Sequence, residues 1–416
     1  MDNFDVVVVG GGPAGLLAAG KAAADGAKVL LLEKMEKPAR KLRITGKGRC
    51  NITNTKPYDE FVLDIFPEPR FLRDAFYSFS NSDIVQLLHD QGVETLEERG
   101  KRVFPVSGKA WDVAEALVKW ARSKGVAIVC HAVAEKVNIE NSRIVSVDYS
   151  VKGAAAKVNC AAVILATGGK SYPATGSTGD GYRFAVDCGH SVTPLLPALV
   201  GVETAPAFNF PKGLSLKNVN LALFIEGKKV DEEFGDMELT DYGFDGPIVL
   251  RLSRRIIFAL LKGSKVELEL DLKPALNHSK LETRLLREAE ENPRIAITDL
   301  ARRLLPKGLA DEMVDQIGLA AQKNLARLTA DERKAIRIWL KEQRFAVVSQ
   351  RLWNEAIVTA GGVSLKEVNP KTMESKIVKG LFFAGELLDL DGSTGGYNLQ
   401  IAYSTGWLAG KGAAAG

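Results

Sequence analysis

The sequence has few of the residues that build metal centres or disulfide frameworks. Its 416 residues include only four cysteines, Cys50, Cys130, Cys160 and Cys188, and no two of them form a C-x-x-C pair. This spacing gives no support to zinc, iron–sulfur or thioredoxin-type sites, and the histidines also lack metal-ligand spacing, so we expect no metal. Four thiols in so long a chain are typical of a reducing compartment, and we expect a cytoplasmic protein.

Long apolar runs and a large excess of one charge are absent as well. The lack of any uninterrupted apolar stretch of about 18 residues predicts no membrane span. We also expect no signal peptide, because no basic segment precedes an apolar run. Lys and Arg number 55 against 51 Asp and Glu, so the chain as a whole is not built to bind nucleic acid or membranes. The helices expected at 279–345 mix basic with acidic residues, which favours solvated helices over a nucleic-acid patch. We expect a small-molecule partner; the sequence does not give the oligomeric state.

Glycine, by contrast, is abundant, with 39 residues that gather in clusters. The first cluster follows a β-branched run at 5–9 that is typical of a strand buried on both faces of a parallel sheet. An alanine-rich helix is expected from about 13 to 25, and a second buried strand over 28–32 ends at Glu33. The chain thus opens with a βαβ unit. The segment at 39–54 is rich in glycine and charge, and we expect an ordered but irregular loop there.

The pattern Gly10-x-Gly12-x-x-Gly15 stands between that first strand and that helix, a context that makes it specific for a dinucleotide. Gly10 would make the tight turn, Gly12 would let the backbone approach a pyrophosphate, and Gly15 would let helix and strand pack closely. The helix N-terminus would offer free N–H groups to the phosphates. Glu33 would accept bonds from both ribose hydroxyls, which predicts a nucleotide without a 2′-phosphate. The alternative is a glycine turn that holds no ligand.

The fingerprint alone does not distinguish FAD from NAD. The strand-like runs between 126 and 160, the strand that ends at 166–168 and a glycine-rich C-terminal segment favour FAD. No second G-x-G-x-x-G follows a strand, so no dedicated NAD(P) site is expected. NAD(P)H stays open as a transient electron donor.

Three longer blocks resemble one family. They are TGKGRCNITN at 45–54, ATGGKSYPATGSTGDGY at 166–182, and a block at 372–410 that includes GLFFAGELLDLDGSTGGYNLQIAYSTGWLAG. Together with the fingerprint they resemble the BaiN/YhiN-like flavoproteins over nearly the whole chain. The resemblance implies an FAD-dependent oxidoreductase related to the glutathione-reductase and fumarate-reductase flavin folds. Members are described as bile-acid-type enoyl reductases or desaturases, as aminoacetone oxidases or as oxidoreductases without a substrate, so no particular substrate is implied.

The predicted fold class is α/β, with a Rossmann-like FAD-binding domain of glutathione-reductase type that is split in sequence. The glycine-rich pattern beside a buried strand occurs in the first residues and again near the C-terminus. We interpret the residues between them as an insertion. We predict a first FAD-binding segment at 1–193, an inserted cap domain at 194–346 and a second FAD-binding segment at 347–416. The insertion is predicted to be β-rich over 194–272 and helical over 273–346.

The resemblance also implies a set of cofactor-binding residues. Glu386 follows a strand at a position where related flavoproteins place an acidic group near the ribityl or phosphate chain. The Gly395–Asn398 turn opens a helix whose N–H groups could face the flavin N1–C2=O edge and stabilise reduced flavin. The residues assigned to the FAD site are Gly10, Gly12, Pro13, Ala14, Gly15, Glu33, Lys34, Lys41, Arg49, Cys50, Asn51, Thr53, Ala134, Thr167, Gly168, Gly385, Glu386, Gly395, Gly396, Tyr397, Asn398 and Leu399.

Four basic side chains crowd the 39–54 segment: Lys41, Arg43, Lys47 and Arg49. One or two of them would neutralise the FAD pyrophosphate or an anionic substrate. The alternative is a solvated basic loop. Cys50 has no other cysteine near it in the sequence, which favours a structural or flavin-neighbour role over redox catalysis.

The chain departs from the family pattern at two places. Lys47 stands where a third glycine is usual in TGGGRCN. The stretch TDYGFDGP at 240–247 resembles T-H-x-G-x-S-G-P, with Asp241 in place of the histidine and Asp245 in place of the serine. An acid–base role of that histidine therefore cannot be transferred. The catalytic residues stay unassigned, with Asp241, Tyr172 and Tyr397 as weak candidates and packing as the alternative role of the tyrosines.

We therefore expect hydride transfer between flavin N5 and a carbon of a small organic substrate, either an enone or saturated ketone or an amine. One alternative is a flavin-dependent RNA-modifying protein, because some tRNA-modifying flavoproteins share this flavin fold. The other is a non-catalytic flavin-binding protein.

Overall fold

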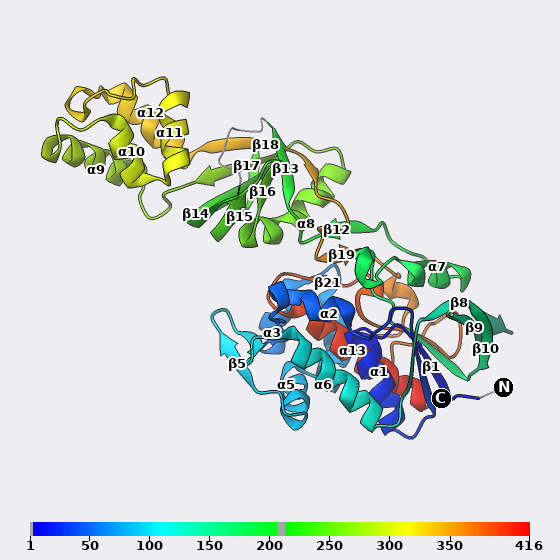
Figure 1. Cartoon of the computed structure of the whole chain (residues 1–416). Helices are drawn as coiled ribbons and strands as arrows, with labels where there is room; N and C mark the ends of the chain where they lie inside the picture. Colours follow the sequence, from blue (N-terminus) through cyan, green and yellow to red (C-terminus); the bar gives the residue numbers. More distant parts are fainter. Residues whose placement is uncertain (1–2, 206–212) are drawn as a thin grey trace. The chain divides into compact units, whose positions relative to one another are not determined.

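The computed structural model describes residues 3–205 and 213–416, in two compact units (Figure 1). Unit 1 consists of Met1–Pro197 and Trp353–Gly416, and unit 2 consists of Ala198–Leu352. Residues 206–212 of the predicted β-rich segment lie outside the described residues. Within the described residues no helix combines the length and the hydropathy needed to cross a membrane.

A five-stranded parallel sheet forms the centre of unit 1. The strand order is β20–β11–β1–β2–β7, and each neighbouring pair is parallel. Strands β1, β2 and β11 are buried along their whole length, as expected for strands covered on both faces. The bounds are β1 (Val6–Val9), β2 (Val29–Glu33), β7 (Ala127–Cys130), β11 (Ala162–Leu165) and β20 (Leu381–Phe383).

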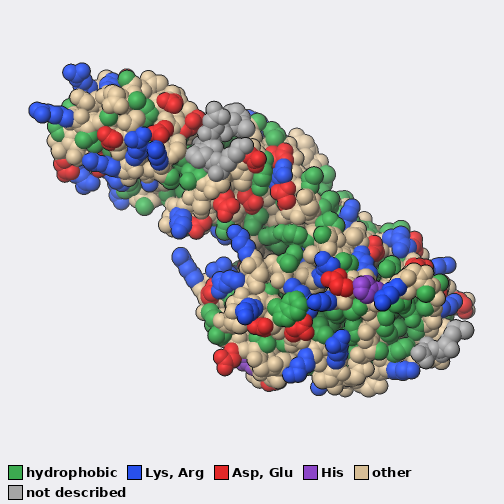
Figure 2. Space-filling view, in the orientation of Figure 1, with side chains coloured by type: hydrophobic (Ala, Val, Ile, Leu, Met, Phe, Trp, Pro, Cys, Tyr) green, Lys and Arg blue, Asp and Glu red, His purple; other side chains and the backbone are tan. Residues whose placement is uncertain are grey.

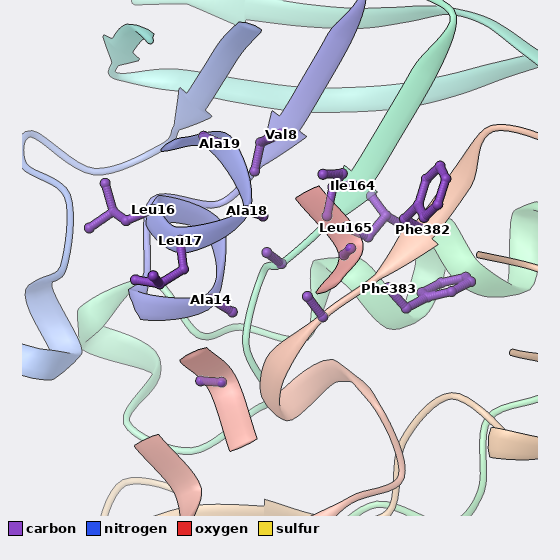
Figure 3. Close-up of a cluster of buried hydrophobic side chains, with 14 of the residues drawn as sticks. Val8, Ala14, Leu16, Leu17, Ala18, Ala19, Ile164, Leu165, Phe382 and Phe383 are labelled. Carbon is purple, nitrogen blue, oxygen red and sulfur yellow. The ribbon is translucent and has the colours of Figure 1, made fainter. Parts of the chain in front are cut away.

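Three helices pack on this sheet or on each other: α1 (Pro13–Ala24), α6 (Ala110–Ser123) and α13 (Tyr397–Ala414). Helix α1 contacts both α6 and α13, and its apolar side chains share one buried cluster with those of β11 and β20 (Figure 3). Small residues let α13 approach α1. A Cβ at Gly406 would lie 2.3 Å from the Ala14 oxygen, and one at Gly410 would lie 2.2 Å from the Ala18 oxygen.

Shorter elements complete unit 1. Strands β8, β9 and β10 form one antiparallel sheet, β3, β6 and β5 form another, and β4 pairs with β21. The strand bounds are β3 (Thr53–Asn54), β4 (Ile65–Phe66), β5 (Thr95–Glu98), β6 (Arg102–Pro105), β8 (Ala132–Glu140), β9 (Arg143–Val151), β10 (Ala154–Asn159), β12 (Leu196–Ala198), β19 (Val358–Ala360) and β21 (Asp391–Gly392). The helix bounds are α2 (Arg40–Ile44), α3 (Tyr58–Phe61), α4 (Arg73–Ser78), α5 (Asn81–Asp90) and α7 (Asp180–Asp187).

The prediction of an irregular loop at 39–54 is wrong for part of that segment. It contains helix α2, a 3₁₀ turn at Thr45–Gly48 and strand β3. Leu42 of α2 is buried, and α2 contacts α6. The local composition disfavours a helix, but packing of one apolar side chain against the main body stabilises this short one.

Unit 2 has its own hydrophobic core. Six antiparallel strands close into a barrel in the order β13–β16–β15–β14–β17–β18 among the described residues. Helix α8 contacts the barrel, and helices α9–α12 follow β17. The bounds are β13 (Val202–Ala205), β14 (Leu214–Ile225), β15 (Lys228–Leu239), β16 (Gly243–Asp245), α8 (Pro247–Leu261), β17 (Val266–Asp271), α9 (His278–Glu291), α10 (Ile297–Leu304), α11 (Lys307–Gln316), α12 (Ala330–Lys341) and β18 (Gln343–Gln350).

Strand β18 differs from the sequence-based expectation, which places residues 343–346 in the helical part of the insertion. They are the start of a strand that pairs with both β13 and β17 and so closes the barrel. Phe345 is buried there against Phe244, with ring centroids 4.7 Å apart. Barrel closure decides the conformation, which local periodicity could not show.

The predicted fold class is confirmed. The parallel sheet receives β20 and the covering helix α13 from the C-terminal part of the chain, so the α/β domain is split in sequence. The inserted residues form an antiparallel barrel followed by helices.

The close packing of α1 and α13 gives a stability test. Gly410→Ala should lower the free energy of unfolding by about 1–3 kcal/mol, because the new Cβ would force the helix backbones apart. Urea unfolding of the purified protein measures the change. Lys411→Ala, at an exposed position of the same helix, is the control and should change the free energy by less than about 0.5 kcal/mol. A Gly410→Ala protein as stable as wild type would mean that this contact does not limit the packing.

Candidate flavin site

The turn between β1 and α1 places three glycines in different surroundings. Gly10 has φ +103°, and a Cβ there would lie 2.5 Å from the Ala166 oxygen. A Cβ at Gly15 would lie 1.9 Å from the Gly10 oxygen, so the chain's own packing requires both glycines. Gly12 has an ordinary φ of −73°, and a Cβ there would meet nothing within 4 Å. The protein itself therefore does not require glycine at position 12, but a ligand that touches this backbone would.

Glu33 lies beside this turn, at the end of β2. Its two carboxylate oxygens accept hydrogen bonds from the Gly11 N–H and the Met35 N–H, each at 2.8 Å. Burial is the largest influence on Glu33 and raises its pKa, although both hydrogen bonds lower it. Each oxygen keeps a further lone pair, so the carboxylate can still accept a hydroxyl group. The structure thus places the predicted ribose acceptor next to the glycine turn.

Predicted residues from distant blocks also meet at the N-terminus of α13. Thr53 donates from Oγ1 to Gln400 Oε1 at 2.7 Å. The Asn51 side-chain amide lies 3.1 Å from both the Thr53 oxygen and the Gly396 nitrogen. Gly396 has φ +99°, and a Cβ there would lie 2.4 Å from the Thr53 carbonyl group. The block at 45–54 therefore packs directly on the first turn of α13.

Asn398 fixes the loop that leads into the same helix. Its Nδ2 donates to the Gly392 oxygen at 2.7 Å, and its Oδ1 accepts from the Gly392 N–H at 2.9 Å. Gly395 has φ +129°, and Leu399 packs partly buried against the core. No side chain caps the helix N-terminus. The positive end of the α13 dipole is thus held in place without a capping anion from the protein.

Lys41 and Glu386, predicted from separate blocks, form an ion pair. Lys41 Nζ lies 2.8 Å from Glu386 Oε2 and donates to Ser171 Oγ at 2.7 Å. Glu386 Oε1 also accepts from Ser171 Oγ at 2.9 Å and from the Thr359 N–H at 2.8 Å. Burial raises the pKa of Glu386, but the Lys41 charge and these hydrogen bonds outweigh burial and hold the pKa below its ordinary value. The ionised carboxylate orients Lys41.

The structure separates the four basic side chains of the 39–54 segment. Lys41 pairs with Glu386, whereas Arg43 pairs with Glu115 at 3.0 Å. Arg49 pairs with Glu98, and Lys47 is exposed. Of these four side chains, Lys41 forms its ion pair with another predicted cofactor residue, Glu386.

The remaining predicted cofactor residues are placed as follows. Lys34 donates to Thr178 Oγ1 and to Asp180 Oδ2, which ties the end of β2 to the start of α7. Gly385 lies against α1, where a Cβ would be 2.8 Å from Ala14 Cβ. Cys50 is buried, and burial raises its pKa to about 12, which makes it a structural thiol. The others lie in three places: Pro13 at the start of α1, Ala134 in β8, and Thr167 and Gly168 directly after β11.

The three weak catalytic candidates lie in different settings. Tyr397 is the first residue of α13, is 4% exposed and packs on Phe61 with ring centroids 4.8 Å apart. Burial raises its pKa to about 12, so its hydroxyl is protonated at neutral pH. Tyr172 begins a 3₁₀ turn with φ +53°. Asp241 is exposed in unit 2, whereas both tyrosines belong to unit 1.

Several polar residues around these groups are not among those predicted from the sequence. Ser171 and Thr359 bind Glu386, and Gln400 binds Thr53. Ser171 lies within the 166–182 block, so a search for buried polar residues in that block could have found it. Thr359 has no local signal, because only the fold brings β19 to Glu386. In the described ranges no group of three or more His, Cys, Asp or Glu residues could hold a metal ion.

These features fit a dinucleotide cofactor. The open space at Gly12 adjoins a helix N-terminus without a side-chain cap, which is the arrangement that binds a diphosphate. Residues 4–412 match the HI0933-like protein Rossmann domain family. The chain belongs to this family. The predicted resemblance to BaiN/YhiN-type flavoproteins is thereby confirmed.

Two kinds of relative cover almost the whole chain of this HI0933-like protein. A 3-dehydro-bile acid delta(4,6)-reductase of Clostridium scindens is 30% identical over 414 residues, which are 98% of each chain. A ribosomal RNA dihydrouridine synthase of Escherichia coli is 29% identical, over 98% of this chain and 97% of that protein. A protein of the same name from Haemophilus influenzae is also 29% identical, over 96% of both chains.

Solved structures of flavoenzymes share the fold. A 3-ketosteroid delta1-dehydrogenase from Sterolibacterium denitrificans has a TM-score of 0.56 at 13% identity, with both chains fully covered. A 3-ketosteroid-delta4-(5alpha)-dehydrogenase from Rhodococcus jostii has a TM-score of 0.53 at 17% identity, with 99% and 97% coverage. At these identities the likeness is one of fold. With the family match, the chain is a flavoprotein oxidoreductase with the Rossmann-like FAD-binding fold.

The glycine turn gives a direct test of cofactor binding. Gly12→Val should fold with the melting temperature of flavin-free wild-type protein, because its φ is ordinary and the added Cβ meets no protein atom within 4 Å. It should nevertheless be colourless, because the side chain would occupy the space that a pyrophosphate needs. Absorbance spectra and thermal unfolding of the two purified proteins measure both effects. Wild-type flavin content in Gly12→Val would contradict the placement of the cofactor at this turn.

The Lys41–Glu386 pair predicts a pH-dependent stability. The folded-state pKa of Glu386 lies below its ordinary value of 4.5, so its stabilising contribution is present above pH 4.5 and is lost as the pH falls through the folded pKa. Glu386→Gln should lower the free energy of unfolding at pH 7 by about 1.5–3 kcal/mol, and the deficit should shrink in acid. Urea unfolding at several pH values measures it. Glu98→Gln, at the more exposed pair with Arg49, is the control and should cost at most about 1 kcal/mol. A deficit for Glu386→Gln that does not change with pH would contradict the assignment.

Proposed function

We propose that this protein binds FAD and uses it to reduce a carbon–carbon double bond conjugated to a carbonyl group. Support comes from the chemistry common to the two kinds of relative. A delta(4,6)-reductase of a 3-dehydro bile acid acts on double bonds in conjugation with a 3-keto group. Formation of dihydrouridine saturates the uracil double bond next to a carbonyl. Each reaction saturates a double bond activated by a carbonyl group, and the chain is 30% and 29% identical to the two relatives.

The residues of unit 1 suit this chemistry. Bound, reduced FAD would supply the hydride for the β-carbon of the conjugated bond, and the adjacent α-carbon would take a proton from a donor that is not assigned. Gly12 and the α1 N-terminus would hold the pyrophosphate, and Glu33 would accept the ribose hydroxyls. The α13 N-terminus, fixed by Asn398 and Thr53, would stabilise the negative charge at the flavin N1–C2=O edge.

The inserted unit is proposed to select the substrate through the loop at 240–247. Tyr242 donates from its hydroxyl to Asp245 Oδ2 at 3.1 Å, and the Arg351 guanidinium lies 4.2 Å from the Tyr242 ring centroid. Asp245 also accepts from the Gly246 N–H. These contacts rigidify the loop and leave Asp241 at an exposed position within it. Asp241 can therefore change without loss of the loop's own packing.

The reductant is proposed to be a nicotinamide that binds transiently, because the chain has no second dinucleotide fingerprint. Under anaerobic conditions NADH or NADPH should bleach the bound flavin. A 3-keto-Δ4 steroid acid or a uridine-containing RNA should then restore the flavin absorbance with formation of the saturated product. Bleaching by amines alone, with no reoxidation by either conjugated substrate, would contradict the proposal.

A variant tests the role of the inserted loop. Asp241→Asn should keep wild-type flavin content and melting temperature, but it should slow reoxidation of the reduced flavin by whichever conjugated substrate is active. Stopped-flow absorbance measures the rate. Asp236→Asn, on strand β15 of the same barrel, is the matched control and should react like wild type. Wild-type rates in Asp241→Asn would place substrate selection elsewhere.

A further inference from the structure

A segment of strong net positive charge lies beside the candidate flavin site. Residues 34–56 contain eight Lys and Arg and a single acidic residue, a net charge of +7, whereas the whole chain has +4. The small net charge of the whole chain therefore does not reveal that this one segment is strongly basic. Figure 2 shows Lys and Arg side chains gathered at the end of unit 1 that carries the β5 hairpin.

Aromatic rings hold part of this charge in fixed positions. The Arg43 guanidinium lies 4.0 Å from the Trp111 ring centroid, and Lys37 Nζ lies 5.1 Å from the same centroid. Trp111 is 47% exposed and Lys37 is exposed, so Lys37 stands at the surface, whereas the Arg43 side chain is only 10% exposed. Such contacts orient long side chains and reduce the entropy that they lose on binding a partner.

A second ring does the same on the neighbouring hairpin. Arg49 lies 4.4 Å and Arg102 lies 5.7 Å from the Phe104 ring centroid. Lys47 lies two residues before Arg49, and Lys101 directly precedes Arg102. Both lysines are exposed. We call the exposed cations Lys37, Lys47, Arg49, Lys101 and Arg102 the basic face.

Not all of this charge is neutralised within the protein. Arg43 and Arg49 have acidic partners, Glu115 and Glu98. In the described part of the chain no acidic side chain forms an ion pair with Lys37, Lys47 or Lys101. These three lysines supply the net positive charge that an external anion would meet.

The basic face is continuous with the candidate flavin site. Lys41 lies in the same short helix as Arg43 and pairs with Glu386, and Asn51 lies next to Gly396 at the start of α13. A chain of phosphates bound along residues 37–49 would therefore pass near the α13 N-terminus. A small carboxylic acid would need one or two of these cations, whereas a polyanion uses all of them.

We propose that the basic face binds the phosphate backbone of single-stranded RNA and so delivers a uracil base to the flavin. The inference rests on the proposed function, in which uracil is one of the conjugated double bonds reduced. Several fixed cations spaced over two segments match a phosphate chain, because each cation that neutralises a phosphate adds independently to affinity. The aromatic rings have cations against them, so we assign the face to phosphates and not to base stacking.

Fluorescence anisotropy with a labelled, uridine-rich RNA of about 20 nucleotides tests the proposal on the full FAD-loaded protein. The test variant is Lys37→Gln, Lys47→Gln and Lys101→Gln together, which leaves Lys41 and Arg49 intact. Because this variant removes three cations that would each neutralise a phosphate, the affinity at 0.1 M salt should fall about 100-fold, and the slope of log K against log salt should become about 2 units less negative. Flavin content and reduction by nicotinamide should stay at wild-type values.

The matched control replaces three exposed lysines of the same unit, Lys119, Lys124 and Lys152, by Gln. It should bind RNA nearly as well as wild type. Equal losses of affinity in both triple variants, or none in either, would overturn the basic face as the binding surface. Binding of wild type to vesicles of anionic lipid but not to RNA would overturn RNA as its partner. If RNA does not bind but a 3-keto-Δ4 steroid acid is reduced, this inference fails and the proposed function stands. If neither conjugated substrate reoxidises the flavin, the proposed function fails.

Discussion

The first turn of α1 is the point at which distant parts of the chain touch through their backbones. Gly10 lies against Ala166 after β11, Gly385 lies over Ala14, and Gly406 of α13 lies over the Ala14 oxygen. A side chain at any of these glycines would come within 3 Å of its neighbour. Three separate segments approach one end of this helix. They can come this close because glycine, which has no side chain, stands at the contact positions. The open position at Gly12 lies in the middle of this arrangement.

The same packing brings two carboxylates, Glu33 and Glu386, into the candidate site. Their surroundings shift their pKa values in opposite directions. Glu33 accepts hydrogen bonds from two backbone N–H groups, but burial outweighs these bonds and the charge of Lys34, so the pKa of Glu33 rises. Glu386 has Lys41 beside it, and its pKa falls. Hydrogen bonds donated by ribose hydroxyls would therefore offset part of the desolvation cost of the Glu33 carboxylate. Glu386 acts as a fixed charge that positions a lysine.

The basic segment at 34–56 shows how packing divides residues that look alike in the sequence. Lys41 turns inward because Glu386 and Ser171 lie there, whereas Arg43 and Arg49 turn to aromatic rings supplied by α6 and β6. This one segment thus contributes side chains both to the interior of the candidate site and to an exposed surface. Short-range composition cannot separate these roles, because each depends on a partner from another part of the chain.

The sequence by itself determined the βαβ unit, the glycine turn, the split of the α/β domain and the family. These features are local: buried strands, a helix and a turn leave periodic and glycine-rich patterns in neighbouring residues. It also named Lys41, Glu386, Asn51 and Gly396, but not as pairs. Only the tertiary structure decided that Lys41 meets Glu386, that residues 343–346 are a barrel strand and that α2 is helical. Each of these depends on contacts between residues far apart in the chain, and no local pattern encodes such contacts.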